Sequence, residues 1–392
     1  MKKLIIIGAN YLQKPLVQKA AEMGLETHVF AWEDGAVAKE IADYFYPISI
    51  LEKEQILAKA REIRPDGIVS IGSDIAMHTV NFISEKLNLV GNTLRCTEIS
   101  TNKYKMRIAL SNAGVSCPKF CSVKGDEKYN IQDFIYPLIV KPTDRSGSRG
   151  VTKIENSKPL ETAIKKAQQE SLSNEAIIEE FFYGKEYSVE MISFQGDHHY
   201  ITVTEKVTTE APYFVETEHH QPAPINIVIE RKIINEVKNG LDALEIKNGA
   251  SHSEVRVNDN GDVKIVEIAG RMGGELIGSD MVYYSTGYDF VKGVIEIALG
   301  EFNGVEKLIS RFSGVYYVIP NPGKIINITD NSGKFPEIVK TEIIYNIGEE
   351  IDYIIDGAGK RPAVFVYFSE KSKFQVNPNE IVVFEVHNED TI

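Results

Sequence analysis

Two glutamates flank a short turn in SEVRVNDNGDVKIVEIAGRMGG, residues 253–274. Alternating apolar and polar residues predict two strands, and the NDNG between them is typical of a tight hairpin turn. Residues of matching parity on paired strands share one face, so we expect Glu254 and Glu267 to lie opposite each other, within one register step. Mg²⁺ takes one or two carboxylates, with phosphates and water as its other ligands. The hairpin therefore predicts a site for Mg²⁺ (or Mn²⁺) bound with a nucleotide.

Two arginines accompany this pair. Arg256 follows Glu254 by two positions and is expected on the same face, and Arg271 lies in the glycine-flanked loop beyond the second strand. The planar fork of an arginine suits a phosphate or a carboxylate. A solvated hairpin with exposed charges is the alternative. Against it, Glu267 interrupts KIVEIAG, an apolar strand that otherwise looks buried, and a buried carboxylate needs a partner.

The segment KPTDRSGSRG, residues 141–150, combines glycines, serines and cations. Its backbone N–H groups could surround phosphate oxygens, the hydroxyls and Arg149 could add donors, and Lys141 before the loop could act as a point charge. Lys103, in an earlier helical segment, could act as a second. An ordinary hairpin turn is the alternative. The candidate phosphate-binding residues of the loop are Ser146, Gly147, Ser148 and Gly150.

A further candidate is AIIEEFFYGKEYSVE, residues 176–190. Backbone groups near Glu180 to Phe182 could pair with an adenine edge, and Glu186 could accept hydrogen bonds from ribose hydroxyls. Aromatic pairs of this kind more often belong to a core, which is the alternative.

The elements that must position these residues begin with an alternating region. The segments 3–9, 25–32 and 66–73 are predicted strands, and 12–24 and 52–65 are predicted helices. Such alternation predicts a doubly wound parallel sheet. A dinucleotide site would need Gly-x-Gly-x-x-Gly after the first strand. Here Gly8 is followed by bulky Tyr11 and Gln13, so NAD and FAD are not expected.

Composition narrows the class of protein. The 392 residues carry a formal net charge of -13 and have a composition near the globular average, so neither a nucleic acid nor a membrane is an expected partner. The apolar run in MKKLIIIGAN is too short for a signal peptide or a membrane span. Cys96, Cys117 and Cys121 form no disulfide framework, and Cys117 with Cys121 lacks the second half of a zinc site. These features predict a cytoplasmic protein.

The order of the motifs resembles the ATP-grasp superfamily of ATP-dependent carboxylate ligases. The resemblance covers nearly the whole chain: the N-terminal α/β region, the helix in NKYKMRIALSNAGVSCP, LIVKPTDRSGSRGV, IIEEFFYGKEYSVE and the paired-glutamate hairpin. It implies an α/β plus α+β protein in four parts. These are a Rossmann-like parallel-sheet domain (1–100), a small ATP-grasp subdomain with the glycine-rich loop (101–184), a large subdomain with the metal site (185–300) and a β-rich C-terminal domain (301–392).

By this resemblance, each candidate acquires a role. Lys103 and Lys141 would hold the ATP phosphates under the loop from Ser146 to Gly150, and Arg271 would face an acyl phosphate, with Arg256 and Lys141 also at the reacting centre. Glu179, with the backbone of Phe181 and Phe182, would bind adenine, and Glu186 the ribose. Glu254 and Glu267 would ligate the metal. Many members carry an asparagine two residues after the second glutamate as a further metal ligand, whereas this chain has Ala269, so either Glu267 would bridge two ions or a water would replace the amide. A similar substitution occurs in some ligases that act on amino acids.

The implied reaction converts ATP to ADP and phosphate while a small-molecule carboxylate is joined to an amine. The acid is activated as an acyl phosphate, and an amino acid or dipeptide ligase is the expected kind. Bicarbonate-using enzymes, such as biotin carboxylase and carbamoyl-phosphate synthetase, are the alternative within the superfamily. A nucleotide-binding sensor without turnover is the alternative of another class. Dimers are common in the superfamily, so a homodimer is expected by analogy.

The acceptor pocket is expected beside EKVTTEAPYFVETEHHQPAPIN, residues 205–226, which its prolines and polar residues predict to be a long loop. Candidates there are Glu216, His219 and His220. The two histidines are adjacent, so on an extended chain they would point apart, and an exposed loop pair is the expectation. Specificity is also expected at the N-terminal strand ends, near Asp74.

Overall fold

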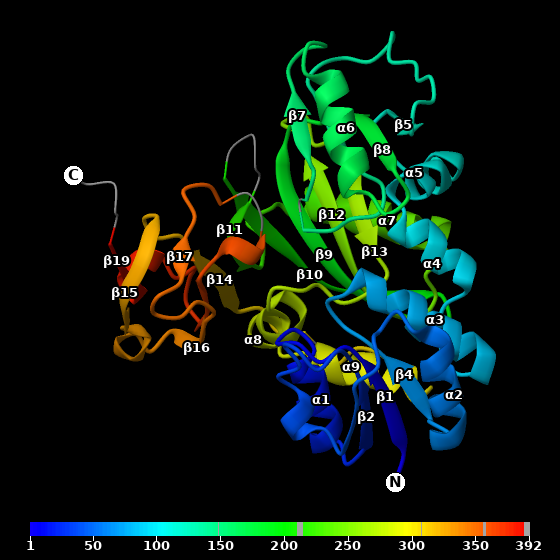
Figure 1. The fold of residues 1–392 in the computed structure, drawn as a ribbon, viewed down its shortest axis with the longest axis vertical. Helices are drawn as coiled ribbons and strands as arrows, with labels where there is room; N and C mark the ends of the chain where they lie inside the picture. Colours follow the sequence, from blue (N-terminus) through cyan, green and yellow to red (C-terminus); the bar gives the residue numbers. More distant parts are fainter. Residues whose placement is uncertain (148, 210–214, 307, 356–357, 388–392) are drawn as a thin grey trace. The chain divides into compact units, whose positions relative to one another are not determined.

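The computed structural model describes residues 1–147, 149–209, 215–306, 308–355 and 358–387 (Figure 1). The chain divides into two compact units, each built from three separate segments. The first unit comprises 1–117, 188–203 and 225–309, and the second comprises 118–187, 204–224 and 310–392. The predicted four-part division stays a prediction. None of the helices in the described ranges has the length and apolar character needed to cross a membrane.

The first unit contains a parallel sheet with helices on both faces and the antiparallel hairpin that carries Glu254 and Glu267. Its elements are β1 (Lys3–Ile7), α1 (Lys14–Glu22), β2 (Glu26–Phe30), η1 (Lys39–Ile41), β3 (Tyr44–Tyr46), α2 (Lys53–Ile63), β4 (Gly67–Val69), α3 (Asp74–Leu87), α4 (Leu94–Thr101), α5 (Lys103–Asn112), α7 (Ile227–Ala243), β12 (Gly249–Val257), β13 (Val263–Ala269), η2 (Ile277–Met281), α8 (Val282–Thr286) and α9 (Phe290–Ala298). The strands β9 (Lys185–Phe194) and β10 (Asp197–Thr208) each have residues in both units.

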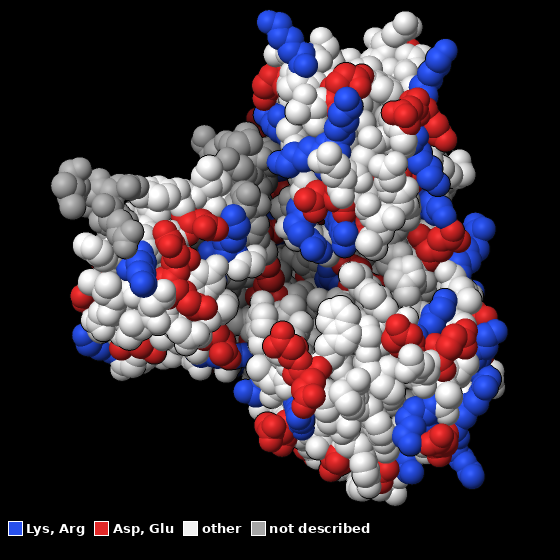
Figure 2. All heavy atoms as spheres, in the orientation of Figure 1, with Lys and Arg blue, Asp and Glu red and all other residues white. Residues whose placement is uncertain are grey.

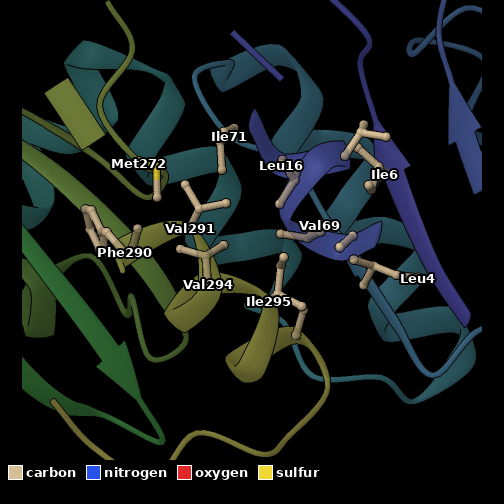
Figure 3. Close-up of a cluster of buried hydrophobic side chains, with 14 of the residues drawn as sticks. Leu4, Ile6, Leu16, Val69, Ile71, Met272, Phe290, Val291, Val294 and Ile295 are labelled. Atoms are coloured by element: carbon tan, nitrogen blue, oxygen red, sulfur yellow. The ribbon is translucent and has the colours of Figure 1, made fainter. Parts of the chain in front are cut away.

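The predicted doubly wound parallel sheet is confirmed. The strand order is β3-β2-β1-β4, and all three pairings are parallel. Leu4 and Ile6 of β1 pack with α1 and α9 on one face, whereas Ile5 and Ile7 pack with α2 and α3 on the other. Figure 3 shows how β1, β4, α1 and α9 contribute to the first of these clusters. Burial on both faces explains why β1 is a continuous apolar run rather than an alternating one.

The helix ends follow the sequence signals. Helix α1 has a proline in its first turn and is followed by Gly24 at φ +71°. Helix α2 ends at Ile63, and its C-cap residue, Arg64, is left-handed at φ 55° and precedes Pro65. Proline fits the first turn because its missing N–H would have no partner there, and it prevents a helix from continuing.

The second unit is built mainly of antiparallel strands. Its elements are β5 (Phe120–Lys124), β6 (Leu138–Pro142), β7 (Thr152–Ile154), α6 (Leu160–Glu170), β8 (Glu175–Glu180), β11 (Glu216–Gln221), β14 (Phe312–Val318), β15 (Gly323–Asp330), η3 (Ser332–Lys334), β16 (Ile338–Ile343), β17 (Glu350–Ile351), η4 (Ala358–Lys360), β18 (Ala363–Ser369), α10 (Pro378–Ile381) and β19 (Val382–His387). Strands β5-β8-β6-β7 form one sheet, against which α6 packs. The strands after residue 310 confirm a β-rich C-terminal region.

The surface carries charges of both signs. On the face drawn in Figure 2, Lys and Arg side chains alternate with Asp and Glu, without a broad basic area.

Candidate functional site

The hairpin of β12 and β13 places Glu254 directly opposite Glu267, as predicted. The turn is closed by the Gly261 N–H, which donates to the Asn258 carbonyl oxygen at 3.0 Å. Both glutamate side chains are about one quarter exposed, at 23% and 25%, while their neighbours Val255 and Ile268 are fully buried. Two carboxylates therefore share the accessible face of an otherwise buried hairpin.

A bulge in β13 produces this alignment. Val255 pairs with Ile265, but the next residue of β12, Glu254, pairs with Glu267, so Val266 is an extra residue in β13. Without it, Glu254 would lie opposite Val266, and Glu267 would share a face with the fully buried Ile265. Arg256 pairs with Lys264 and, by its parity on β12, lies on the Glu254 face.

Lys103 joins this pair from another element. It is the first residue of α5, which Asn102 caps by accepting a hydrogen bond from the Lys105 N–H. Its Nζ donates to Glu267 Oε1 at 2.9 Å. Burial alone would lower the pKa of Lys103, but the Glu267 carboxylate, with smaller effects of Asp74 and Glu254, raises it above its usual value. Lys103 is thus a fixed cation beside the two carboxylates.

Arg271 is bound through its fork to the first residue of α3. Its Nε and Nη2 donate to the two oxygens of Asp74 at 2.9 and 3.1 Å, and its Nη1 donates to the Met272 carbonyl oxygen at 3.1 Å. Burial would raise the pKa of Asp74, but the Arg271 guanidinium outweighs it and holds that pKa below its usual value. The expected role of the Asp74 region in substrate specificity and the predicted contact of Arg271 with a phosphate both stay predictions.

Sequence reasoning missed a second buried pair, formed by Glu190 of β9 and His252 of β12. His252 Nδ1 lies 2.6 Å from Glu190 Oε1, and His252 Nε2 lies 3.8 Å from Glu254 Oε1. Glu190 has no exposed surface, and its Oε2 has no hydrogen-bond partner among the described residues. The available signal was Glu190 itself, a carboxylate within the apolar strand YSVEMIS, as Glu267 is within KIVEIAG. His252 also lies directly opposite Ala269.

Gly273 packs closely against this pair. A Cβ at Gly273 would stand 2.8 Å from His252 Nδ1 and 3.1 Å from Glu190 Oε2, too close for either atom. Gly273→Ala is therefore expected to lower the free energy of unfolding by about 1–3 kcal/mol, because the buried ion pair must shift. Urea unfolding measures this change. Gly274→Ala is the matched control, since its Cβ would meet its nearest neighbour at 3.8 Å. Equal losses in both variants would show that the pair is not held against Gly273.

The same pair gives stability a defined pH dependence. Burial alone would lower the pKa of His252, but the Glu190 and Glu254 carboxylates raise it to about 9. The folded pKa exceeds the value of about 6.5 for an exposed histidine, so the stabilisation is complete below pH ~6.5 and is lost as pH rises through about 9. The free energy of unfolding is expected to fall by about 3 kcal/mol over this range of pH. Urea unfolding between pH 6 and 10 should show this loss of unfolding free energy in the wild type but not in Glu190→Gln. The other titrating groups are the same in both proteins, so the variant serves as the control. If the unfolding free energy of both proteins changes in parallel with pH, the prediction is contradicted.

The fit to a divalent cation follows from the donors present. Among the described residues, no group of three or more His, Cys, Asp and Glu is assembled as a metal site. Mg²⁺ does not need one, because it keeps water and phosphate oxygens and takes only one or two carboxylates. Glu254 and Glu267 are two hard oxygen donors on one accessible face, so the residues fit Mg²⁺ bound together with a polyphosphate.

The second unit contains the other candidate phosphate lysine. Lys141 on β6 and Glu179 on β8 lie on one face of their sheet, with Nζ 2.7 Å from Glu179 Oε2. Their side chains are only 8% and 4% exposed. This is a nearly dry ion pair, so each charge depends strongly on the other.

The glycine-rich loop follows β6. Gly147 and Gly150 both have positive φ, at +70° and +72°, and a Cβ at Gly150 would stand 3.0 Å from Pro142 and Glu170 side-chain atoms. Arg149 Nε donates to the Ser146 carbonyl oxygen at 3.2 Å. The candidate Ser148 lies outside the described residues. Two left-handed glycines give the loop a shape that most side chains would disfavour.

The candidate adenine segment follows β8. The Phe181 N–H donates to the Pro137 carbonyl oxygen at 2.9 Å, and Lys153 Nζ lies 4.6 Å from the centre of the Phe181 ring. The prediction that Phe181 and Phe182 present backbone groups to adenine stays a prediction, with this N–H already engaged. Glu186 on β9 lies 3.0 Å from Lys206 Nζ, whose side chain is only 3% exposed.

The long loop predicted over 205–226 is wrong where strands form, at the end of β10 and over the whole of β11. Residues 216–221 form β11, which pairs with both β10 and β14, and residues 210–214 lie outside the described ranges. His219 and His220 are 1% and 2% exposed, so the expected exposed pair is also wrong. His220 Nδ1 lies 3.0 Å from the Tyr367 hydroxyl and Nε2 lies 2.7 Å from Glu218. Flanking strands on both sides bury this polar segment.

Glu216, the third candidate of that segment, belongs to a row of charges in which the two cations are buried and the two carboxylates are partly buried. Lys206 Nζ lies 3.5 Å from its carboxylate, and Arg361 Nη1 donates to its carbonyl oxygen at 3.1 Å. The Arg361 guanidinium also lies 3.6 Å from the centre of the Tyr317 ring. Glu186, Lys206, Glu216 and Arg361 therefore alternate in charge within the second unit.

Comparison with known proteins finds a family model that matches the central part of the chain. Residues 134–280 match the family model described as an ATP-grasp domain. The alanine–anticapsin ligase of Bacillus subtilis is 26% identical over 302 residues, which cover 68% of this chain and 64% of that protein. The chain thus matches somewhat less than two thirds of the length of this curated relative.

Solved structures show the same fold over the whole chain. An L-amino acid ligase from Bacillus licheniformis has a TM-score of 0.84 and 23% identity, with 99% of both chains covered. A phosphoribosylglycinamide synthetase from Anaerococcus prevotii has a TM-score of 0.78 and 20% identity, with 98% of this chain and 100% of that chain covered. At these identities the likeness establishes the fold.

Proposed function

We propose, given that residues 134–280 are an ATP-grasp domain, that this chain is an ATP-dependent ligase that joins a small-molecule carboxylate to an amine. The single observation that carries the proposal is the face-to-face pair of Glu254 and Glu267 with Lys103 Nζ 2.9 Å from Glu267. Two carboxylates and a lysine on one accessible face suit a divalent cation bound with the phosphates of ATP.

The residues that would bind the nucleotide are part of the same proposal. Glu254 and Glu267 would hold Mg²⁺ (or Mn²⁺), which when bound neutralises charge on the transferring phosphate. Lys103 and Lys141 would bind phosphate oxygens, and the loop from Ser146 to Gly150 would cover them. The assignment of adenine to Glu179, Phe181 and Phe182 and of ribose to Glu186 is also part of the proposal.

The chemistry then needs no protein nucleophile. A carboxylate oxygen of the substrate attacks the γ-phosphorus of ATP, the bond to the bridging oxygen breaks, and ADP leaves. Arg271, with Arg256 and Lys141, would stabilise the negative charge of the transferring oxygens. The amine nitrogen attacks the acyl carbon, releases phosphate, and loses a proton to give the amide. Water must be excluded while the acyl phosphate exists.

An amino acid is the favoured substrate. The support is the similarity to two proteins whose names give this substrate class, the alanine–anticapsin ligase and the L-amino acid ligase. The three cysteines are free thiols, which together with a need for ATP favours a cytoplasmic location.

The test is release of ADP and phosphate across a panel of amino acids and small acids, each with and without an amine, under saturating Mg·ATP. We expect release to require the acid, to increase with an amine, and to yield one amide per ADP by mass spectrometry. Bicarbonate as the sole effective acid would instead support the carboxylase-type alternative. Tight ATP binding without release for any acid would support a sensor and contradict the ligase.

A further inference from the structure

A small cavity of about 40 Å³ lies within the first unit, where the end of β4 meets α3, β12, α9 and the loop after β13. Its apolar walls include Val69, Val80, Ala250, Met272 and Val294. Figure 3 shows Val69, Met272 and Val294 in one cluster, which they join from β4, the loop after β13 and α9. The cavity is thus built by the same packing that joins the parallel sheet to the hairpin.

The polar side chains in the cavity wall are engaged elsewhere. Each of these side chains donates a hydrogen bond to another protein group. Asn81 Nδ2 donates to Thr97 Oγ1 at 2.8 Å, and Ser70 Oγ donates to the Ile7 carbonyl oxygen at 2.6 Å. Asn92 Nδ2 donates to the Asn248 carbonyl oxygen at 2.7 Å, and Asn248 Nδ2 donates to the Gly91 carbonyl oxygen at 2.9 Å. A guest would gain little by replacing these hydrogen bonds. The cavity therefore favours an apolar guest.

The position of the cavity connects it with the candidate reacting centre. Arg271 forms part of its wall, and so does Met77, one helical turn after the Asp74 that holds the Arg271 fork. The cavity also lies at the carboxyl end of β4, the edge of a parallel sheet where ligands generally bind. A hydrogen bond of 3.3 Å from the Gly72 N–H to the Met272 carbonyl oxygen joins the two loops that border it.

We propose that this cavity receives the side chain of the carboxylate substrate, and that the substrate is an α-amino acid with a short aliphatic side chain. The inference rests on the proposed ligase function and names its specificity pocket. One water needs about 10–15 Å³ of such volume, so this cavity has room for about three groups of that size. A side chain of two or three carbons fits, whereas a charged side chain would lose its hydration without gaining a partner.

Calorimetric titration of the full chain tests the pocket, in the presence of Mg²⁺ and a non-hydrolysable ATP analogue. The probes are glycine, alanine, 2-aminobutyrate, valine and leucine. We expect affinity to rise to 2-aminobutyrate or valine and to fall for leucine, with steps on the order of tenfold for each poorly fitting carbon. The rate of ADP release is measured in parallel with the same series.

Two variants change the size of the cavity in opposite directions. Ala250→Val fills it and should weaken valine binding by about tenfold or more relative to glycine. Met77→Ala enlarges it and should favour leucine by a similar factor. Ala20→Val is the matched control, because Ala20 of α1 is also buried in the same hydrophobic cluster but does not line the cavity. It should leave the ranking of the series unchanged.

The possible outcomes test the proposed pocket and the proposed ligase reaction independently. A ranking that follows cavity size without ADP release would contradict the ligase and leave the pocket standing. No binding of any member, a flat ranking, or an equal shift in Ala20→Val and Ala250→Val would overturn the pocket, even if another acid supported ADP release. If Ala250→Val fails to fold, Met77→Ala decides alone: an unchanged preference for leucine overturns the proposal.

Discussion

Glu267→Gln is expected to reduce kcat/KM for ADP release by about 10²–10³-fold while the protein remains folded. The amide can still accept the hydrogen bond from Lys103 Nζ, which lies 2.9 Å from Glu267, so the local packing survives. The substitution removes the negative charge of residue 267, so the proposed Mg²⁺ site keeps only one of its two carboxylates. ADP release measures the reaction, and Mn²⁺ binding followed by electron paramagnetic resonance measures the site without turnover.

Glu245→Gln provides the control for this substitution. Glu245 belongs to the same unit, where its carboxylate forms an ion pair with Arg95 at 2.7 Å on the exposed surface. Its loss should leave both measurements within twofold of the wild type, since exposed pairs contribute little. Wild-type Mn²⁺ affinity in Glu267→Gln would show that the hairpin does not hold the metal.

Lys141→Met is expected to lower the free energy of unfolding by about 3–5 kcal/mol and to weaken ADP binding strongly. The stability loss arises because Glu179, 4% exposed, keeps a buried charge after its lysine 2.7 Å away is removed. The loss of binding is expected because the cation proposed to bind the phosphates disappears. Urea unfolding and calorimetry with Mg·ADP measure the two effects separately.

The double variant Lys141→Met, Glu179→Leu distinguishes the two causes. Replacing a buried ion pair by apolar residues of similar volume is often neutral for stability. The double variant should therefore recover most of the unfolding free energy but not the affinity for ADP. If ADP affinity returns together with stability, neither side chain contacts the nucleotide and the pair is structural.

Much of the hairpin could be predicted from the sequence, because alternation and the NDNG turn define the two strands. The register could be predicted only within one step, and the missing step is the bulge at Val266. No residue type marks a bulge at that position. The extra residue is favoured by what lies around it: Ile265 enters the buried face, and Glu267 turns towards Lys103.

The polar strand β11 could not be predicted from the sequence. ETEHHQ has few residues that favour strands, and the prolines that follow it, Pro222 and Pro224, suggest a loop. In the fold, β10 and β14 satisfy its backbone on both sides, and Tyr367 and Glu218 satisfy His220. Tertiary context decides such a segment. Glu190 could have been noticed as a carboxylate in an apolar strand, but its partner His252 lies 62 residues away and no local pattern joins them.

The ion pair between Lys103 and Glu267 has a consequence for the order in which ligands bind. A divalent cation that binds Glu267 competes with the ammonium group 2.9 Å from it, and the ammonium group then becomes available to a phosphate oxygen. Metal and polyphosphate would each improve the affinity for the other, and by thermodynamic reciprocity the two factors are equal. If Glu267 holds the cation and Lys103 the phosphate, as proposed, this one salt bridge makes the binding of cation and nucleotide cooperative.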